Sequence, residues 1–398
     1  MNAENKDKKW RFWPILLLAF FYPVNNALIS IAIPIYFYGI NIKVFLIGFL
    51  TAGTAISYCF SPILLYKLSK KLGRKKSVEI SMGLTTLAQF IYYITLHPII
   101  FLFSRIFEGF SIGMFWTNLQ SSISDNVLHD HTKMMSRYNI SWNAGLLGGY
   151  LIGAIFLFII NDIVLIFYIA PLFVVLNFII AIMFFQEPEK INLKRGLELK
   201  ENLSLESKNL NRNDLKLANL NLVPILPVII VLIFTLSKGA PLFLYPILSE
   251  ILGFQSFTVY IQTFFCVLFQ LIGTGIAAFF SLKYLKRLPI FCILVLGICI
   301  FFFSMTKQFI NFFILFIILG FFSGLMYGFS LKFIMALNMK QNTSKYANML
   351  ESVIGIGFFS VQIMCGFLAS LGIDIAFIIT SCIIIFAIIP TLYYLYKL

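Results

Sequence analysis

The sequence predicts an all-α membrane protein whose twelve transmembrane helices form two six-helix, pseudo-symmetric bundles. The 398 residues are 60% apolar and only 12% charged, whereas soluble proteins are about half apolar and about a quarter charged. Twelve apolar runs approach or exceed the roughly 20 residues that a helix needs to cross a bilayer. Features of the first six runs recur in the second six. This composition excludes a soluble enzyme and a disordered chain.

The predicted spans follow one another with short connections. The first begins after a basic stretch and is too long for a signal-peptide core, so we interpret it as a retained span. Gly39 to Asn41 separates it from the second, and His97-Pro98 separates the third from the fourth. In chain order the spans are 12–39, 43–66, 77–96, 98–124, 138–160, 163–185, 223–247, 255–280, 288–306, 308–336, 344–370 and 372–396.

A polar segment divides six spans from six. Between Gln186 and Asn221 it contains seven basic and six acidic residues, which is typical of a solvated connection. We therefore expect an N-terminal bundle at 1–185, a linker at 186–222 and a C-terminal bundle at 223–398.

Basic residues predict the orientation in the membrane. They concentrate before the first span, in the connection after the second span and in the linker, whereas the odd-numbered connections contain only Lys43 and Lys307. Lys and Arg accumulate on the cytoplasmic side of membrane proteins. We therefore expect a multi-pass protein of the cell membrane with both termini and the linker cytoplasmic.

The two halves repeat weakly. Gly109 and Gly113 of the fourth span correspond to Gly320 and Gly324 of the tenth at an offset of 211 residues. The residues before spans five and eleven correspond at 208, and Asn26 corresponds to Lys238 at 212. This near-constant offset indicates two halves in parallel repeat, each built from inverted three-helix units around a midplane site.

The connection after the second span carries a recognisable motif. Gly73, Arg74 and Lys75 match the cytoplasmic motif of the major facilitator superfamily, although Tyr66 and Lys70 replace its first Gly and its Asp. The chain therefore resembles that superfamily over all twelve spans. The resemblance implies a twelve-span secondary transporter working by alternating access. It also implies a cytoplasmic gate of Gly73, Arg74 and Lys75 in which Arg74 pairs with Asp125. The alternative is that the two cations only signal topology.

Two glycine stripes are candidate helix-packing positions. Gly109 and Gly113 follow Arg105 at four-residue spacing in the fourth span, similar to the family's motif there. Gly145, Gly149 and Gly153 in the fifth resemble its antiporter motif, with Tyr150 in place of Pro. Such stripes let helices approach closely.

Ionisable residues within the apolar runs are the strongest indication of a site, because a charge inside a membrane usually marks a pathway or a buried pair. We select Asn26, Arg105, Glu108, Lys238, Glu351 and Gln362 as substrate or coupling residues. Arg105 and Glu108 share a helix face and alternatively neutralise each other. Lys238 has no carboxylate nearby on its own helix, so snorkelling or a partner on another helix is its alternative. Either Glu108 or Glu351 is a candidate proton carrier.

The charges also bear on the substrate. Lys238 and Arg105 come from opposite halves at similar depth, in the middle to outer part of the membrane, and favour a neutral or anionic small molecule. Glu351 lies in the inner, cytoplasmic half of its span and favours a cation, as in multidrug exporters. Import or export, and symport or antiport, remain open. The alternative functions are a proton-coupled exporter of lipophilic cations and a channel-like or non-transporting receptor. We expect a monomer in contact with lipid, with no nucleic acid, cofactor, metal or enzymatic activity.

Overall fold

The fold is known from a computed structural model that describes residues 11–124, 131–187, 223–277, 279–280, 282–341 and 345–396. These residues form helices and no strand, which confirms the predicted fold class. The N-terminal half contains α1 (Trp13–Gly39), α2 (Val44–Tyr58), α3 (Ser61–Leu64), α4 (Tyr66–Leu72), α5 (Arg74–Ile94), α6 (Pro98–Ser124), α7 (His131–Ile160) and α8 (Val164–Phe184).

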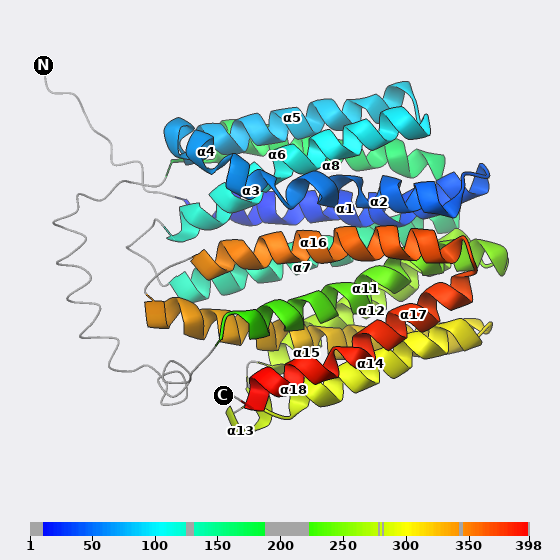
Figure 1. Cartoon of the computed structure of the whole chain (residues 1–398). Helices are drawn as coiled ribbons and strands as arrows, with labels where there is room; N and C mark the ends of the chain where they lie inside the picture. Colours follow the sequence, from blue (N-terminus) through cyan, green and yellow to red (C-terminus); the bar gives the residue numbers. More distant parts are fainter. Residues whose placement is uncertain are drawn as a thin grey trace, which may run out of the picture.

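The C-terminal half contains α11 (Ile225–Ile251), α12 (Ser256–Ala277), α13 (Leu282–Leu285), α14 (Leu288–Met305), α15 (Phe309–Gln341), α16 (Lys345–Ala369), α17 (Ile373–Phe386) and α18 (Ile388–Tyr396). The long helices of both halves run roughly parallel to one axis (Figure 1). Helices α1 and α11 begin, and α8 and α18 finish, at one end of the bundle, which we call the linker end. The predicted linker lies outside the described residues, except for Gln186 and Glu187.

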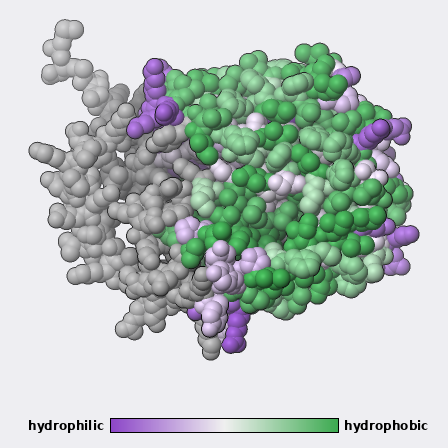
Figure 2. Space-filling view, in the orientation of Figure 1, coloured by the Kyte–Doolittle hydropathy of each residue, from purple (hydrophilic) through white to green (hydrophobic). Residues whose placement is uncertain are grey.

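An apolar belt surrounds the helices. Exposed Phe, Ile and Leu side chains cover the visible middle of the molecule, while polar residues collect near the two ends (Figure 2). Within the described part of the chain, eleven helical segments are long and apolar enough to cross a membrane. A surface of this kind is what a bilayer requires, because its core offers no hydrogen-bond partners.

The third predicted span differs from the other eleven. It forms α5, which has the length of a span but falls short of their hydropathy. Its polar residues are buried against α6 rather than facing outward: the hydroxyl of Ser81 donates to the Ser111 carbonyl, and Thr85 and Ser111 share a hydrogen bond of 2.7 Å. A span can therefore be polar on the face that it buries in protein.

Two predicted spans are interrupted. The second predicted span, 43–66, divides after Tyr58 into α2 and the short α3. The last one divides at Ala387 into α17 and α18, three residues before Pro390. Proline has no N–H for the helix ladder and clashes with the preceding turn, so a break there is expected.

The predicted glycine stripes lie at helix crossings. A methyl group at Gly109 would meet the Thr54 carbonyl oxygen, and one at Gly145 or Gly149 would meet carbonyl oxygens of α1. Gly113 packs against Ser61, and Gly153 packs against Tyr260 of the other half. Gly320 and Gly324 repeat the pattern against α12.

We expect Gly109→Ala to destabilise the protein by about 1–3 kcal/mol, because backbone atoms of two packed helices must move apart. Gly275→Ala is the matched control, since nothing lies within 4 Å of a methyl group there. Thermal unfolding of both variants in detergent tests this expectation. Equal midpoints for the two variants would contradict it.

Candidate functional site

A cavity of about 310 Å³ lies between the two halves. Helices α1, α2, α6 and α7 line it from one half, and α11, α12, α15 and α16 from the other. Its volume is at the lower end of the range for small-molecule sites. Helices α5, α8, α14 and α17 contribute no lining residue, so their role is to support the inner helices.

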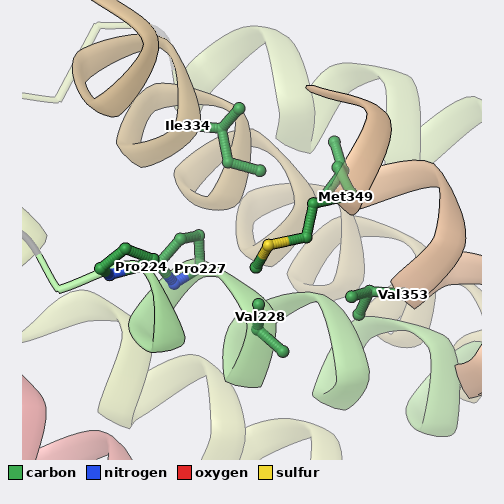
Figure 3. Close-up of a pocket in the computed structure, with 7 residues that line it drawn as sticks. Pro224, Pro227, Val228, Ile334, Met349 and Val353 are labelled. Carbon is green, nitrogen blue, oxygen red and sulfur yellow. The ribbon is translucent and has the colours of Figure 1, made fainter. Parts of the chain in front are cut away.

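A second pocket is much smaller than this cavity and has an apolar lining. It lies between α11, α15 and α16 and measures about 10 Å³. Pro224, Val228, Ile334, Met349 and Val353 surround it with apolar groups (Figure 3). It is barely large enough for one water molecule and offers no polar side chain to hold one.

The lining follows the internal repeat. Tyr22, Asn26 and Ser30 of α1 face the cavity, and so do Phe234, Lys238 and Leu242 of α11, each 212 residues later. Both helices contain a proline at the equivalent position, Pro34 and Pro246, and continue through it. Equivalent positions on the two helices therefore carry different chemistry: α1 presents three polar groups to the cavity, and α11 presents one cation between two apolar residues.

Lys238 is buried, with 5% of its surface exposed. Its ammonium group donates to Gln270 Oε1 at 2.5 Å and lies 5.9 Å from the centre of the Phe234 ring. Both neighbours suit a cation, one through a carbonyl dipole and one through the ring face. Among the described residues Lys238 has no ion-pair partner.

Arg105 is paired. Its Nη1 donates to Glu108 Oε2 at 2.7 Å and its Nη2 donates to Thr54 Oγ1 at 3.1 Å. Both members of the ion pair are almost fully buried, but only Arg105 lines the cavity. Mutual neutralisation on one helix face, the alternative that the sequence left open, is the arrangement observed.

Glu108 is enclosed by donors. Tyr22 Oη and Gln89 Nε2 donate to its Oε1 at 3.1 and 3.0 Å, and Tyr92 Oη donates to its Oε2 at 3.2 Å. With Arg105 this makes four donors on one carboxylate, so its hydrogen-bonding capacity is fully used within the protein. Gln89 also exchanges two hydrogen bonds with Asn25.

Glu351 contacts the other half. Tyr58 Oη donates to its Oε2 at 3.0 Å and Gln120 Nε2 donates to its Oε1 at 3.0 Å. Glu351 belongs to the C-terminal half, and both donors belong to the N-terminal half. These hydrogen bonds must therefore change if the halves move relative to each other.

The cations and Glu351 occupy different levels along the bundle axis. Gly239, beside Lys238, packs against Phe358 and Val361 of α16. Arg105 of α6 packs against Gly53, which lies midway along α2. One end of α2, at Gly48, meets Gln362 and Gly366 of α16, and the other end, at Tyr58, meets Gly355. Both cations are therefore level with α16 near residue 360. Glu351 lies about nine residues nearer the linker end, which is about 13 Å along a helix.

The structure thus gathers most of the predicted residues. Asn26, Arg105, Lys238, Glu351 and Gln362 all line this cavity, and Glu108 lies directly behind Arg105. Sequence reasoning missed the aromatic lining and the Asn25–Gln89 pair. Ser81, Thr85 and Gln89 recur every four residues along α5, and this stripe was the available signal for the pair. The missed aromatic lining residues are Trp116, Tyr138, Trp142, Tyr150, Phe234, Tyr327 and Phe358.

The predicted gate is described only in part. Asp125 lies outside the described residues, so its pairing with Arg74 stays a prediction. Arg74 Nη1 donates to Asn118 Oδ1 at 3.2 Å. Glu187, at the start of the predicted linker, accepts from the backbone N–H groups of Arg74 and Lys75 at 2.9 and 2.6 Å. A carboxylate there suits the positive end of α5. Gly73 precedes the helix at φ +86°, a conformation that favours glycine.

One protein family and several solved structures are similar to this chain. The model of the Major Facilitator Superfamily matches residues 15–222. No curated protein matches the sequence. The fold is similar to a D-xylose-proton symporter, with a TM-score of 0.72 and 15% identity over 96% of each chain. It is also similar to a bacterial homologue of the human lysosomal transporter Spinster, with a TM-score of 0.73 and 13% identity over 98% of each chain. The nucleoside transporter NupG gives a TM-score of 0.68 and 14% identity over 96% of this chain and 98% of NupG.

Proposed function

The chain belongs to the major facilitator superfamily, and from that premise we propose that it moves a small organic solute across the membrane by alternating access. It is a transporter of this fold, not an enzyme. One observation carries the proposal: a cavity lies between two pseudo-symmetric halves and receives polar and charged side chains from both. Sites at the interface between repeats are where such transporters bind solute.

The contacts on either side of the cavity differ in kind. Toward the end opposite the linker end, Gly48 and Gly366 bring α2 and α16 together, and the rings of Phe158 and Phe257 meet at 5.3 Å. Toward the linker end, Glu351 bridges the halves through hydrogen bonds. We propose that 1–185 and 223–398 rock as two bodies joined by the linker 186–222, and that Glu351 exchanges its partners when they do.

Glu351 is the proposed coupling residue. It lines the cavity, has two neutral donors and is not ion-paired among the described residues. Glu108 is the weaker candidate, because it is paired with Arg105, accepts from three further donors and lies behind the cavity wall. Intramembrane carboxylates of this kind commonly relay protons.

The names of similar proteins agree with a small-molecule substrate and with protons. One is described as a D-xylose-proton symporter and another as a nucleoside transporter. Both names denote polar organic solutes. At 13–15% identity these structures share the fold with this chain, and the solute must be argued from the residues of its own cavity.

A proton-coupled exporter of lipophilic cations is the second candidate. Glu351 and the aromatic lining favour it, because aromatic faces and a carboxylate attract such cations. Tetraphenylphosphonium binding to the purified protein tests it. Tight binding that requires Glu351 would support export, and no binding would remove this candidate.

Solute accumulation by proteoliposomes tests secondary transport itself. We expect solute to accumulate above the external concentration when a proton gradient is imposed, and to leak back when a protonophore collapses the gradient. A channel gives downhill flux without accumulation, and a receptor gives no flux. Binding candidates come from a thermal-shift screen, since a ligand stabilises the folded state that binds it.

Reporter fusions test the proposed location in the cell membrane with both termini and the linker cytoplasmic. We expect a cytoplasmic signal from a fusion after Leu398 and from one within 188–222. An external signal from either site would contradict the charge-based topology.

A further inference from the structure

The cavity contains balanced charges at separate levels. Arg105, Lys238 and Glu351 are the charged residues that line it in the described part of the chain. Glu108 neutralises Arg105 at 2.7 Å. One uncompensated cation, Lys238, therefore remains at one level and one uncompensated carboxylate, Glu351, remains nearer the linker end. The empty cavity is neutral as a whole but strongly polarised along the bundle axis.

Two buried polar atoms at the cation level have no hydrogen-bond partner among the described residues. Arg105 Nε is a donor without an acceptor, and Gln362 Oε1 is an acceptor without a donor. Both residues line the cavity, and only 3% of the Arg105 surface is exposed. Buried polar groups are normally satisfied, so unpaired ones at a cavity wall indicate where a ligand or water completes the bonding.

These atoms specify a ligand with two kinds of group. Lys238 and Arg105 Nε need an acceptor. An anionic oxygen accepts from both donors and also compensates the positive charge of Lys238. Gln362 Oε1 needs a donor, which a hydroxyl group supplies. Trp142 and Tyr150 line the same cavity and offer flat apolar faces to the C–H surface of a ring. We propose, resting on the transport function above, that the solute is a hydroxylated organic monoanion that crosses together with one proton carried by Glu351.

Charge balance explains why the two travel together. The empty cavity holds one cation and one carboxylate beyond the Arg105–Glu108 pair. Binding a monoanion alone leaves a net charge of about −1 in a low-dielectric site, which is unfavourable. A proton taken from water onto Glu351 restores neutrality, and its release with the solute on the other side restores the empty state. Transport is therefore electroneutral, with one proton per anion.

Protonation of Glu351 also affects the contact between the halves. The groups around this carboxylate are Tyr58 on α2, Gln120 on α6, Tyr138 on α7 and Tyr327 on α15. All are uncharged, so no described cation opposes its neutralisation. A neutral carboxyl accepts weaker hydrogen bonds from Tyr58 and Gln120 than a carboxylate does. The proton therefore loosens the polar contact between the halves while the anion occupies the level of the two cations.

Three probes of matched shape test the substrate class: D-glucuronate, D-glucose and D-glucosamine, which are anionic, neutral and cationic. In proteoliposomes of the full chain we expect glucuronate to accumulate under an inwardly directed proton gradient and to be unaffected by a potassium–valinomycin potential. Glucose and glucosamine should show at least tenfold lower uptake. Preferred uptake of glucosamine, equal uptake of all three, no uptake of any probe under the gradient, or glucuronate uptake driven by the potential would each overturn the proposal.

Lys238→Gln tests the anion site directly. We expect glucuronate binding to weaken about 10-fold to 100-fold, as for loss of a charge-assisted hydrogen bond, while D-glucose binding changes less than threefold. Lys307→Gln, at an exposed loop lysine, is the control. A Lys238→Gln variant that still prefers glucuronate over glucose contradicts the proposal. If that variant does not fold, the three-probe comparison on the unmodified protein decides.

Different results would contradict the transport function and the substrate class. If glucose or glucosamine accumulates against its gradient and glucuronate does not, secondary transport stands and the monoanion is wrong. If every probe that crosses only equilibrates under an imposed gradient, the transport function is wrong as well.

Discussion

Replacing Glu351 with glutamine is expected to abolish uphill transport and to leave solute exchange intact. Glutamine keeps the size of the side chain, and it can accept from Gln120 and donate to the Tyr58 hydroxyl, which reverses one of the two hydrogen bonds. It carries no titratable proton. One pH unit is worth about 1.36 kcal/mol, so at one proton per solute the unmodified protein should accumulate about tenfold per unit of gradient. The variant should reach a ratio of about one.

The measurement compares accumulation and counterflow in the same vesicles. Glu108→Gln is a further comparison, because Glu108 lies behind the cavity wall and should affect stability more than coupling. Asp374→Asn, at an exposed position on α17, is the matched control and should accumulate normally. If Glu351→Gln vesicles still concentrate solute when the gradient is imposed, Glu351 does not carry the coupling proton.

Removing the Arg105 side chain should cause a large loss of stability. Arg105→Ala leaves the buried Glu108 without its cation. Breaking one partner of a buried ion pair typically costs about 3–5 kcal/mol. Tyr22, Gln89 and Tyr92 still donate to the carboxylate, but neutral donors do not cancel its charge.

The double variant Arg105→Met/Glu108→Gln should recover most of this loss, because its buried groups are uncharged. The glutamine oxygen can accept from Tyr22 and Gln89, and its N–H can donate to the Tyr92 hydroxyl. The thermal midpoint in detergent reports both effects. Glu79→Gln, which breaks the more exposed Lys75–Glu79 pair at 3.6 Å, is the control and should cost at most about 1 kcal/mol. A double variant no more stable than Arg105→Ala would show that the pair is not what stabilises this region.

The contrast between Glu108 and Glu351 shows what could be read from the sequence. Both stood out as carboxylates within apolar runs, because such residues are costly and seldom incidental. Their roles could not be separated, because the partners of Glu108 lie on α1, α5 and α6 and those of Glu351 on α2 and α6 of the other half. Helical spacing predicts neighbours within one helix only, which is why only the Arg105–Glu108 pairing was anticipated.

The sequence predicted the third span but not its buried polar face, and it did not predict the aromatic lining. Run length predicted the third span at 77–96, but its average hydropathy is low because α5 buries a polar face against α6. Aromatic residues are frequent throughout this chain, with 46 Phe and 18 Tyr. Composition therefore did not distinguish Tyr138 or Trp142, which face the cavity, from the many aromatic residues that face lipid.

The sequence by itself determined the membrane environment, the helical fold, the two related halves and the few residues whose charge inside the membrane demands a reason. Those properties depend on the length, hydropathy and spacing of segments, which are local or periodic quantities. Only the tertiary structure decided that Arg105 is neutralised while Lys238 is not, that Glu351 reaches across to Tyr58 and Gln120, and that these charges occupy separate levels of one cavity. Charge balance in a low-dielectric site depends on distances between helices far apart in sequence, and only packing determines those distances.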